Sequence, residues 1–360
     1  MKGRSDAWRW TTAGFALLAG LLLALAFLTP GTSVLAAGGE APGNTFRSVE
    51  TTDGFELSVG WRDFDGTRLE ASFPISRAAL AAAEAEFGYA PAEMERELDV
   101  REAAPRRDMI LRLRASLEAD IKRSGYSDYM RIEDKDPLTF TLKVSAPPEA
   151  RKDVKAAYDA VVARLAGEQQ AELKALASER ERMGRRYIEE RGLRFIGDAI
   201  AVDYARIVSS NRDRLRHILE AIRDARQEAS LRALLGVLLS FIQGIPYGTP
   251  PLEEDGKRIL QFWVPPKVLV RNLGDCDSKA VAFAALWINV KKYPLLLIKV
   301  PGHMFIGLAV PGLGDEVVIN GVRYTLCEVA GPEPVPPGMI SAASRLYLEA
   351  GRYQYEIIRD

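Results

Sequence analysis

The chain has very little cysteine and histidine, with two of each among 360 residues. This scarcity argues against a zinc site, because such sites draw several Cys or His ligands from close spacings. The sequence also lacks a G-x-x-x-x-G-K phosphate loop and a Rossmann glycine fingerprint. A formal net charge of −1 gives no reason to expect a nucleic-acid partner. We therefore predict no metal, no cofactor and no nucleic acid.

The first residues have the pattern of a targeting segment. Lys2, Arg4 and Arg9 precede an apolar run over residues 13–27, and small residues follow over 33–37. Basic residues, a short apolar run and small residues at a cleavage site are typical of a secretory signal. The run is shorter than the roughly 20 residues that span a membrane. We predict that residues 1–37 are a cleaved signal peptide, with an uncleaved N-terminal anchor as the alternative. In both cases the body is exported, to the periplasm or the extracellular space.

Residues 38–146 are predicted to form a separate α+β region. Alternating stretches at 55–59 and 68–73 flank a turn, which is a hairpin signal. Ser76 is placed to cap an alanine-rich helix that runs to about residue 86. We expect a second helix over 107–123 and another strand over 138–144.

Residues 147–192 are charged and helical. An apolar stripe is formed by Val154, Tyr158, Val161 and Leu165. The stripe predicts a long solvated helix that packs one face on the N-terminal region or links it to the next domain. A coiled-coil dimer is the alternative, although the heptads are broken. This N-terminal half is also where an envelope protein partner would bind.

The remaining segment, 193–360, is predicted to be an α+β catalytic domain. Asn211 is expected to cap one amphipathic helix, and a second covers about 228–242. After a third helix from Cys276 come predicted strands at 295–300, 304–310, 316–319 and 322–329. Asn320-Gly321 between the last two is a strong hairpin signal.

The candidate site residues lie in two short motifs. Gly274-Asp275-Cys276 opens a run that is apolar on every side, so Cys276 should lie at the first turn of a buried helix. Free N–H groups and the helix dipole favour a thiolate there. Gly302-His303 begins an extended run, so an imidazole on a strand can face the thiol. His217, the other histidine, lies opposite the apolar stripe of its helix and is predicted to be a surface residue.

GDC at a helix start followed by GH at a strand start resembles the transglutaminase-like cysteine enzymes, in particular the bacterial cysteine peptidase type. The resemblance covers roughly Val202 to Ala330 and implies a papain-like core of helices on an antiparallel sheet. It implies an acid on the strand after the histidine strand, here Glu328, where that family usually has Asp. It also implies an oxyanion donor ahead of the nucleophile, for which Gln243 is the candidate.

Several alternatives remain at this stage. Asp315, Glu316 and Asn320 compete with Glu328 for the role of orienting His303. Cys276 and Cys327 could instead form a disulfide in an oxidising compartment. Adjacent strand residues face opposite sides, so a Glu328 that faces the site turns Cys327 away from it.

Two functional hypotheses follow. The first is an exported thiol enzyme that attacks an amide of a protein or peptide, with a thiol pKa well below about 8.5. Water as the acceptor makes it a peptidase, and a lysine amine makes it a transglutaminase. The second is a non-catalytic scaffold of the same fold that binds an envelope protein or peptide. The carboxylates of Asp275 and Asp277 are a complication for the first hypothesis, because they disfavour a thiolate.

Overall fold

The structure is a computed structural model of the chain that describes residues 10–11, 44–136, 138–226, 230–290, 293–310, 312–331 and 334–359. Apart from Trp10–Thr11, the predicted targeting segment 1–37 lies outside these residues. Across the described ranges, none of the helices combines the length and the apolarity that a membrane crossing needs. Export therefore stays a prediction.

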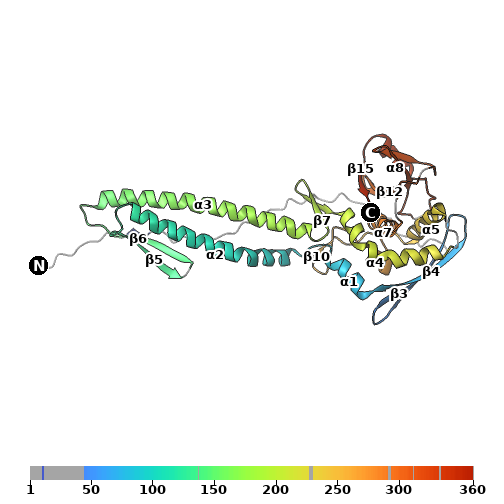
Figure 1. Cartoon of the computed structure of the whole chain (residues 1–360), viewed down its shortest axis with the longest axis horizontal. Helices are drawn as coiled ribbons and strands as arrows, with labels where there is room; N and C mark the ends of the chain where they lie inside the picture. The colour runs from blue at the N-terminus through green and yellow to red at the C-terminus, as the bar shows by residue number, and fades with distance from the viewer. Residues whose placement is uncertain are drawn as a thin grey trace. The chain divides into compact units, whose positions relative to one another are not determined.

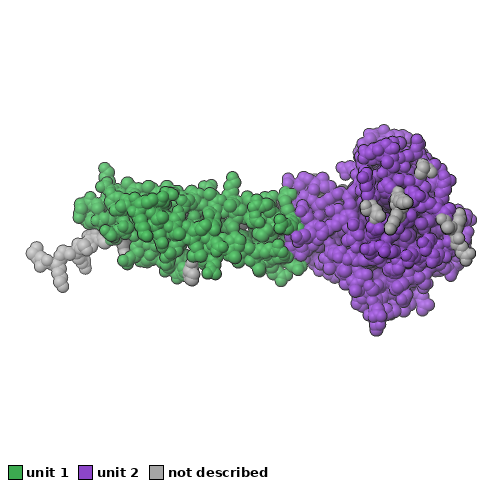
Figure 2. Space-filling model, in the orientation of Figure 1, with its two compact units in different colours: residues 1–32, 92–186 green, residues 33–91, 187–360 purple. Residues whose placement is uncertain are grey.

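The chain divides into two compact units (Figure 2). Unit 1 comprises residues 1–32 and 92–186, and unit 2 comprises residues 33–91 and 187–360. These limits differ from the predicted boundaries at 146/147 and 192/193. The first hairpin of the supposed N-terminal region belongs to the unit that carries the site. The charged helix and the rest of that region form one body.

Unit 1 is a pair of long helices joined by a β-hairpin (Figure 1). Helix α2 (Pro91–Arg123) and helix α3 (Arg151–Glu189) flank strands β5 (Met130–Asp136) and β6 (Thr139–Val144) in the sequence. The two-residue strand β1 (Trp10–Thr11) pairs with β6. Antiparallel pairing of the helices is visible in their ion pairs, Arg112–Glu172 at 2.8 Å and Arg180–Glu102 at 2.6 Å.

The predicted stripe on α3 is buried inside this unit. Val154, Val161 and Leu165 join one apolar cluster with Met109 and Leu117 of α2, and Tyr158 packs against its edge. The helix therefore covers its apolar face with residues of its own chain. Burial of that face supplies most of a long helix's stability.

Unit 2 begins with a three-stranded antiparallel sheet in the order β2-β3-β4. The strands are β2 (Thr45–Glu50), β3 (Gly54–Arg62) and β4 (Arg68–Ser76), followed by helix α1 (Arg77–Ala85). The predicted hairpin and cap are confirmed. The Ala79 N–H donates to Ser76 Oγ at 3.1 Å, which satisfies one of the unpaired N–H groups at the helix start.

The apolar face of this sheet explains why the sheet belongs to unit 2 and not to the predicted N-terminal region. Trp61 is almost fully buried, and its Nε1 donates to the buried Ser240 Oγ at 3.2 Å. The ring of Phe241 packs edge-on against Trp61 and Phe73. Alternation in the sequence identifies the apolar face of a strand but not the helix that covers it. Here the cover is α5, which lies about half the chain away.

Helices form the centre of unit 2. One prediction here is wrong: α4 begins at Tyr204, and Asp203 caps it by accepting from the Arg206 N–H at 3.1 Å. Asn211 lies buried within that helix and donates to the Ile207 carbonyl at 2.9 Å. The elements of this part are β7 (Leu193–Ile196), β8 (Ala199–Val202), α4 (Tyr204–Asp224), α5 (Leu231–Gly244), β9 (Glu253–Glu254), β10 (Lys257–Arg258), α6 (Pro265–Arg271) and α7 (Cys276–Trp287).

A five-stranded antiparallel sheet in the order β13-β14-β12-β11-β15 packs against α7. Residues 320 and 321 both have positive φ, 51° and 78°, as a tight hairpin turn requires. The four strands predicted from the sequence are confirmed to within two residues. The described chain is thus a mixed fold of helices and antiparallel sheets. The last elements are β11 (Leu295–Val300), β12 (His303–Leu308), β13 (Glu316–Ile319), β14 (Val322–Cys327), α8 (Ala342–Glu349) and β15 (Gln354–Ile358).

Candidate functional site

Cys276 is the first residue of α7, as the sequence predicts. Asp275 caps the helix by accepting from the Ser278 N–H at 3.0 Å. Gly274 pairs with the chain that follows α5, because its carbonyl accepts from Gly248 N at 3.2 Å and its N–H donates to the Pro246 carbonyl at 3.3 Å. The start of α7 is therefore fixed by a cap and by a neighbouring segment.

His303 is the first residue of β12. The two-residue connection from β11 passes through Gly302, whose φ of +75° lies in the left-handed region that favours glycine. The backbone N–H of Met304, the next residue, lies near the sulfur of Cys276 and lowers the pKa of its thiol. Helix α7 packs on β12, so the thiol lies beside the peptide that follows His303, and the pairing of the two side chains stays a prediction.

Glu328 lies one residue beyond β14 and contacts His303. Nε2 of His303 is 2.8 Å from Oε1 and 2.9 Å from Oε2 of Glu328. Oε1 also accepts from the N–H groups of Val329 at 3.1 Å and Ala330 at 3.3 Å. Because Nε2 faces the carboxylate, Nδ1 is the ring nitrogen left to serve the thiol.

The three residues that compete with Glu328 have other partners or positions. Asp315 forms an ion pair with Arg345 at 2.6 Å, and Glu316 pairs with Arg323 at 2.8 Å. Asn320 occupies the hairpin turn of β13 and β14. Of the four candidates, Glu328 is the one placed on the imidazole.

The environment of the thiol differs from the sequence-based expectation. Burial raises the pKa of Cys276, the carboxylates of Asp277 and Asp275 raise it further, and the Met304 N–H opposes them. The sulfur of Cys276 lies 3.4 Å from Asp277 Oδ1, within reach of a hydrogen bond from a protonated thiol. These surroundings therefore raise the thiol pKa, which is the opposite of the low value that the sequence predicts.

Two further side chains meet Asp277. The hydroxyl of Tyr204 donates to Oδ2, and Lys299 Nζ lies 3.9 Å from the same oxygen. Tyr247 lies near Cys276 as well, and burial followed by the nearby negative charges raises its pKa to about 12. Sequence analysis missed these residues, because Tyr204 and Tyr247 come from other elements and carry no motif.

Gln243 does not have the predicted role. Its Nε2 donates both hydrogens, to the Glu328 carbonyl at 2.7 Å and the Val335 carbonyl at 2.8 Å. Its Oε1 accepts from the Val335 N–H at 2.8 Å. The amide has no hydrogen left for an oxyanion, so Gln243 holds the backbone behind Glu328 instead. The N–H of Cys276, at the first position of α7, remains an available oxyanion donor.

Cys327 and His217 lie outside the contacts that join Cys276, His303 and Glu328. Both cysteines are free thiols, and Cys327 is fully buried in β14. His217 is exposed on α4, and its Nε2 lies 2.7 Å from the Pro74 carbonyl. This matches the surface position predicted for it.

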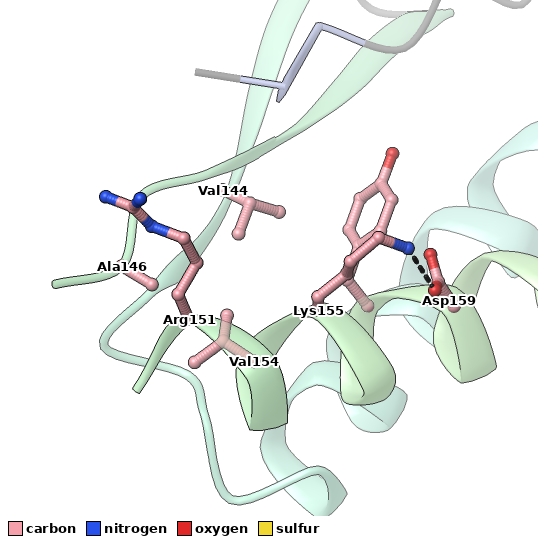
Figure 3. A pocket seen from close by; sticks show the side chains of 7 residues that line it. Val144, Ala146, Arg151, Val154, Lys155 and Asp159 are labelled. Carbon is pink, nitrogen blue, oxygen red and sulfur yellow. Dashed lines mark hydrogen bonds and ion pairs between the residues drawn. The ribbon is translucent and has the colours of Figure 1, made fainter. Parts of the chain in front are cut away.

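A pocket in unit 1 has no candidate nucleophile (Figure 3). Its apolar wall is formed by Val144, Ala146 and Val154, and the Lys155–Asp159 ion pair at 2.6 Å lies on its polar side. The candidate residues Cys276, His303 and Glu328 all belong to unit 2.

Comparison of the chain with known protein families, with characterised proteins and with solved structures finds no match. The geometry around Cys276 is therefore the basis on which a function can be proposed.

Proposed function

We propose that this protein is a thiol enzyme that cleaves or transfers an amide, on a papain-like, transglutaminase-like core. The carrying observation is one arrangement of three residues. Glu328 binds Nε2 of His303 with both carboxylate oxygens, and the Cys276 sulfur lies against the peptide N–H next to that histidine. A nucleophile, a base and a group that orients the base are the parts that acyl transfer requires.

In the proposed reaction the Cys276 sulfur attacks the carbonyl carbon while Nδ1 of His303 accepts the thiol proton. The Nε2–H of the resulting imidazolium donates to Glu328, whose charge stabilises it. The Cys276 N–H binds the oxyanion. The imidazolium then gives its proton to the leaving amine, and a thioester remains on Cys276. Water or a second amine attacks that thioester, with His303 again taking the proton.

A protonated thiol in the free enzyme changes the moment at which the proton leaves the sulfur, but not which bonds form and break. Since burial and two carboxylates raise the thiol pKa, the proton has to leave as the carbon–sulfur bond forms. His303 then acts as a general base in the attack and is not the cation of a preformed ion pair. The resemblance to small bacterial cysteine peptidases favours water as the acceptor, hence hydrolysis of an exported or envelope peptide.

A non-catalytic scaffold is the second candidate. The observation that favours it is the state of Cys276, which is only 8% exposed and whose thiol pKa is raised. Such a protein would keep the fold to bind a peptide or an envelope protein. The N-terminal part of the chain would then supply the partner surface.

An activated ester separates the two candidates. Full-length protein is mixed with p-nitrophenyl acetate, and the acyl group is mapped by peptide mass spectrometry. We expect an acetyl thioester on Cys276 with steady release of nitrophenol. His303→Ala should abolish the turnover and His217→Ala should leave it intact. Equal nitrophenol release by wild type and Cys276→Ala would reject the enzyme and leave the scaffold.

A further inference from the structure

Lys279 is a fully buried lysine one helical turn beyond Cys276 on α7. Its Nζ donates to the carbonyls of Ala330 at 2.6 Å, Ile245 at 2.7 Å and Gln243 at 3.4 Å. An ammonium has three hydrogens to donate, so three carbonyl acceptors satisfy it completely. The residues that follow Lys279 on α7, from Ala280 to Trp287, are apolar and buried.

Packing alone does not account for a lysine at this position. Burial lowers the pKa of Lys279 to about 7, against the raising influence of Glu328 and Cys276, so the charged form is costly here. An apolar side chain of similar volume often stabilises a protein core as well or better than a buried charge. The role of the ammonium therefore depends on which parts of the backbone its three hydrogen bonds connect.

Those bonds connect the two halves of the candidate site. Ala330, whose carbonyl binds the ammonium, uses its own N–H to hold Oε1 of Glu328 at 3.3 Å. Ile245, the second partner, directly precedes the segment that pairs with Gly274 beside Cys276. The helix of the nucleophile is thus bonded to the turn that holds the acid.

We propose that Lys279 is a positioning residue: its ammonium fixes the turn at Glu328–Ala330 to α7, and so keeps the Glu328 carboxylate on Nε2 of His303 in register with Cys276. The catalytic consequence rests on the proposed function. The effect on the His303–Glu328 contact does not, because it is a property of the folded protein alone. Outer contacts that orient a reactive group act in this way without touching substrate.

Histidine scarcity makes the contact directly measurable. With two histidines in the chain, a sample labelled with ¹⁵N-histidine gives ring signals from His303 and His217 only. A ring N–H held by a carboxylate gives a downfield proton signal that exchanges slowly with water. Lys279→Met removes the charge at similar length. Lys267→Met is the matched control, since Lys267 is another largely buried lysine but pairs with Glu84 and Glu254.

We expect the downfield Nε2–H signal of His303 in the wild type and in Lys267→Met, and its loss in Lys279→Met. With p-nitrophenyl acetate, kcat should fall roughly 10- to 100-fold in Lys279→Met while KM changes little, because displacement of a catalytic group by about 1 Å costs that much. Lys279→Gln, which keeps two N–H donors, should give an intermediate signal and an intermediate kcat.

Unchanged signal and unchanged kcat in folded Lys279→Met would overturn the proposal. So would loss of folding in both Lys279 variants while Lys267→Met folds, because the residue would then serve stability alone. If the wild type shows no turnover but its His303 signal depends on Lys279, the proposed function fails and the positioning role stands. If turnover is present and neither kcat nor the His303 signal depends on Lys279, the proposed function stands and the positioning role fails.

Discussion

Both carboxylate oxygens of Glu328 lie within 2.9 Å of Nε2 of His303. The longer side chain of Glu, compared with Asp, is accommodated because it folds back over its own backbone. Oε1 accepts from the N–H groups of Val329 and Ala330, which draws the carboxylate toward the end of β14. Glutamate therefore reaches the imidazole from the residue that follows β14.

Replacement of Glu328 by Gln should lower kcat by about 10²- to 10⁴-fold, because an amide still hydrogen-bonds the ring but does not stabilise an imidazolium. The measurement is steady-state hydrolysis of p-nitrophenyl acetate, with circular dichroism to confirm that the fold is kept. Glu316→Gln is the matched control, since Glu316 pairs with Arg323 on the neighbouring hairpin. Wild-type turnover in Glu328→Gln would assign the orienting role to another group or to none.

Local patterns predicted much of the site. The apolar run after Cys276 and the extended run after His303 each determine one element by short-range periodicity. The positive φ at Asn320 and Gly321 follows from the residue types themselves. Residues near one another in sequence therefore gave the helix start, the strand start and the hairpin correctly.

Contacts distant in sequence account for the errors. The sequence leaves the Gln243 amide free as a donor, yet its partners come from residues 85 and 92 positions away. Trp61 reaches Ser240 across 179 positions, and this contact places the first sheet in unit 2. The raised thiol pKa arises from burial before charge, and burial of Cys276 depends on packing between α7 and the sheet. No local pattern contains this information.

Asp277→Asn should make Cys276 more reactive toward chloroacetamide at pH 7.5. The carboxylate of Asp277 raises the thiol pKa, so its removal lowers that pKa and enlarges the thiolate fraction. The rate constant should rise about tenfold for each unit of fall in the thiol pKa, since the pH stays below it. The rate constants of the two proteins are compared at the same pH values between 6 and 10. Asp213→Asn, on an exposed part of α4, is the control, and a slower reaction of Asp277→Asn would contradict the assigned charge effect.

Asp275→Asn should stabilise the protein at neutral pH but not at pH 4. Burial raises the folded-state pKa of Asp275 to about 6 from 3.8, so its protonated form is the one that the fold favours. Its contribution to stability is fully present below about pH 3.8 and is lost as the pH rises through about 6. Asparagine keeps the helix cap without the charge. At pH 7.5 the gain in unfolding free energy should be roughly 3 kcal/mol at most, from 1.36 kcal/mol per unit.

Urea unfolding of Asp275→Asn and wild type at pH 4, 5, 6 and 7.5 measures this difference. The two curves should coincide at the lowest pH and separate with rising pH. A difference that is constant across the series would mean that Asp275 has the same pKa in the folded and in the unfolded protein.

Unreduced protein should contain Cys276 and Cys327 as free thiols. Both are unpaired in the structure, and burial raises the pKa of Cys327 to about 12, which suppresses its oxidation through the thiolate. Mass spectrometry after alkylation in 6 M guanidinium chloride should find both cysteines labelled without a reductant. A quantitative Cys276–Cys327 disulfide would remove the nucleophile from the proposed reaction.

Trp61→Ala should destabilise unit 2 and leave unit 1 unchanged. Trp61 is about 1% exposed, donates to Ser240 and packs its ring on Phe241, so its removal leaves a cavity under the first sheet. Such a truncation costs roughly 3–5 kcal/mol. Hydrogen exchange followed by mass spectrometry should show faster exchange over residues 44–91 and in α5, with no change over residues 92–186.

Leu117→Ala is the matched variant for unit 1, because Leu117 is equally buried in the cluster between α2 and α3. It should speed exchange over residues 92–186 and spare the first sheet. If Trp61→Ala instead loosens residues 92–186 while α5 keeps its protection, the first sheet belongs to the N-terminal body, as the sequence alone suggested. The two variants together therefore test the boundary between the units, because each variant weakens the core of one unit.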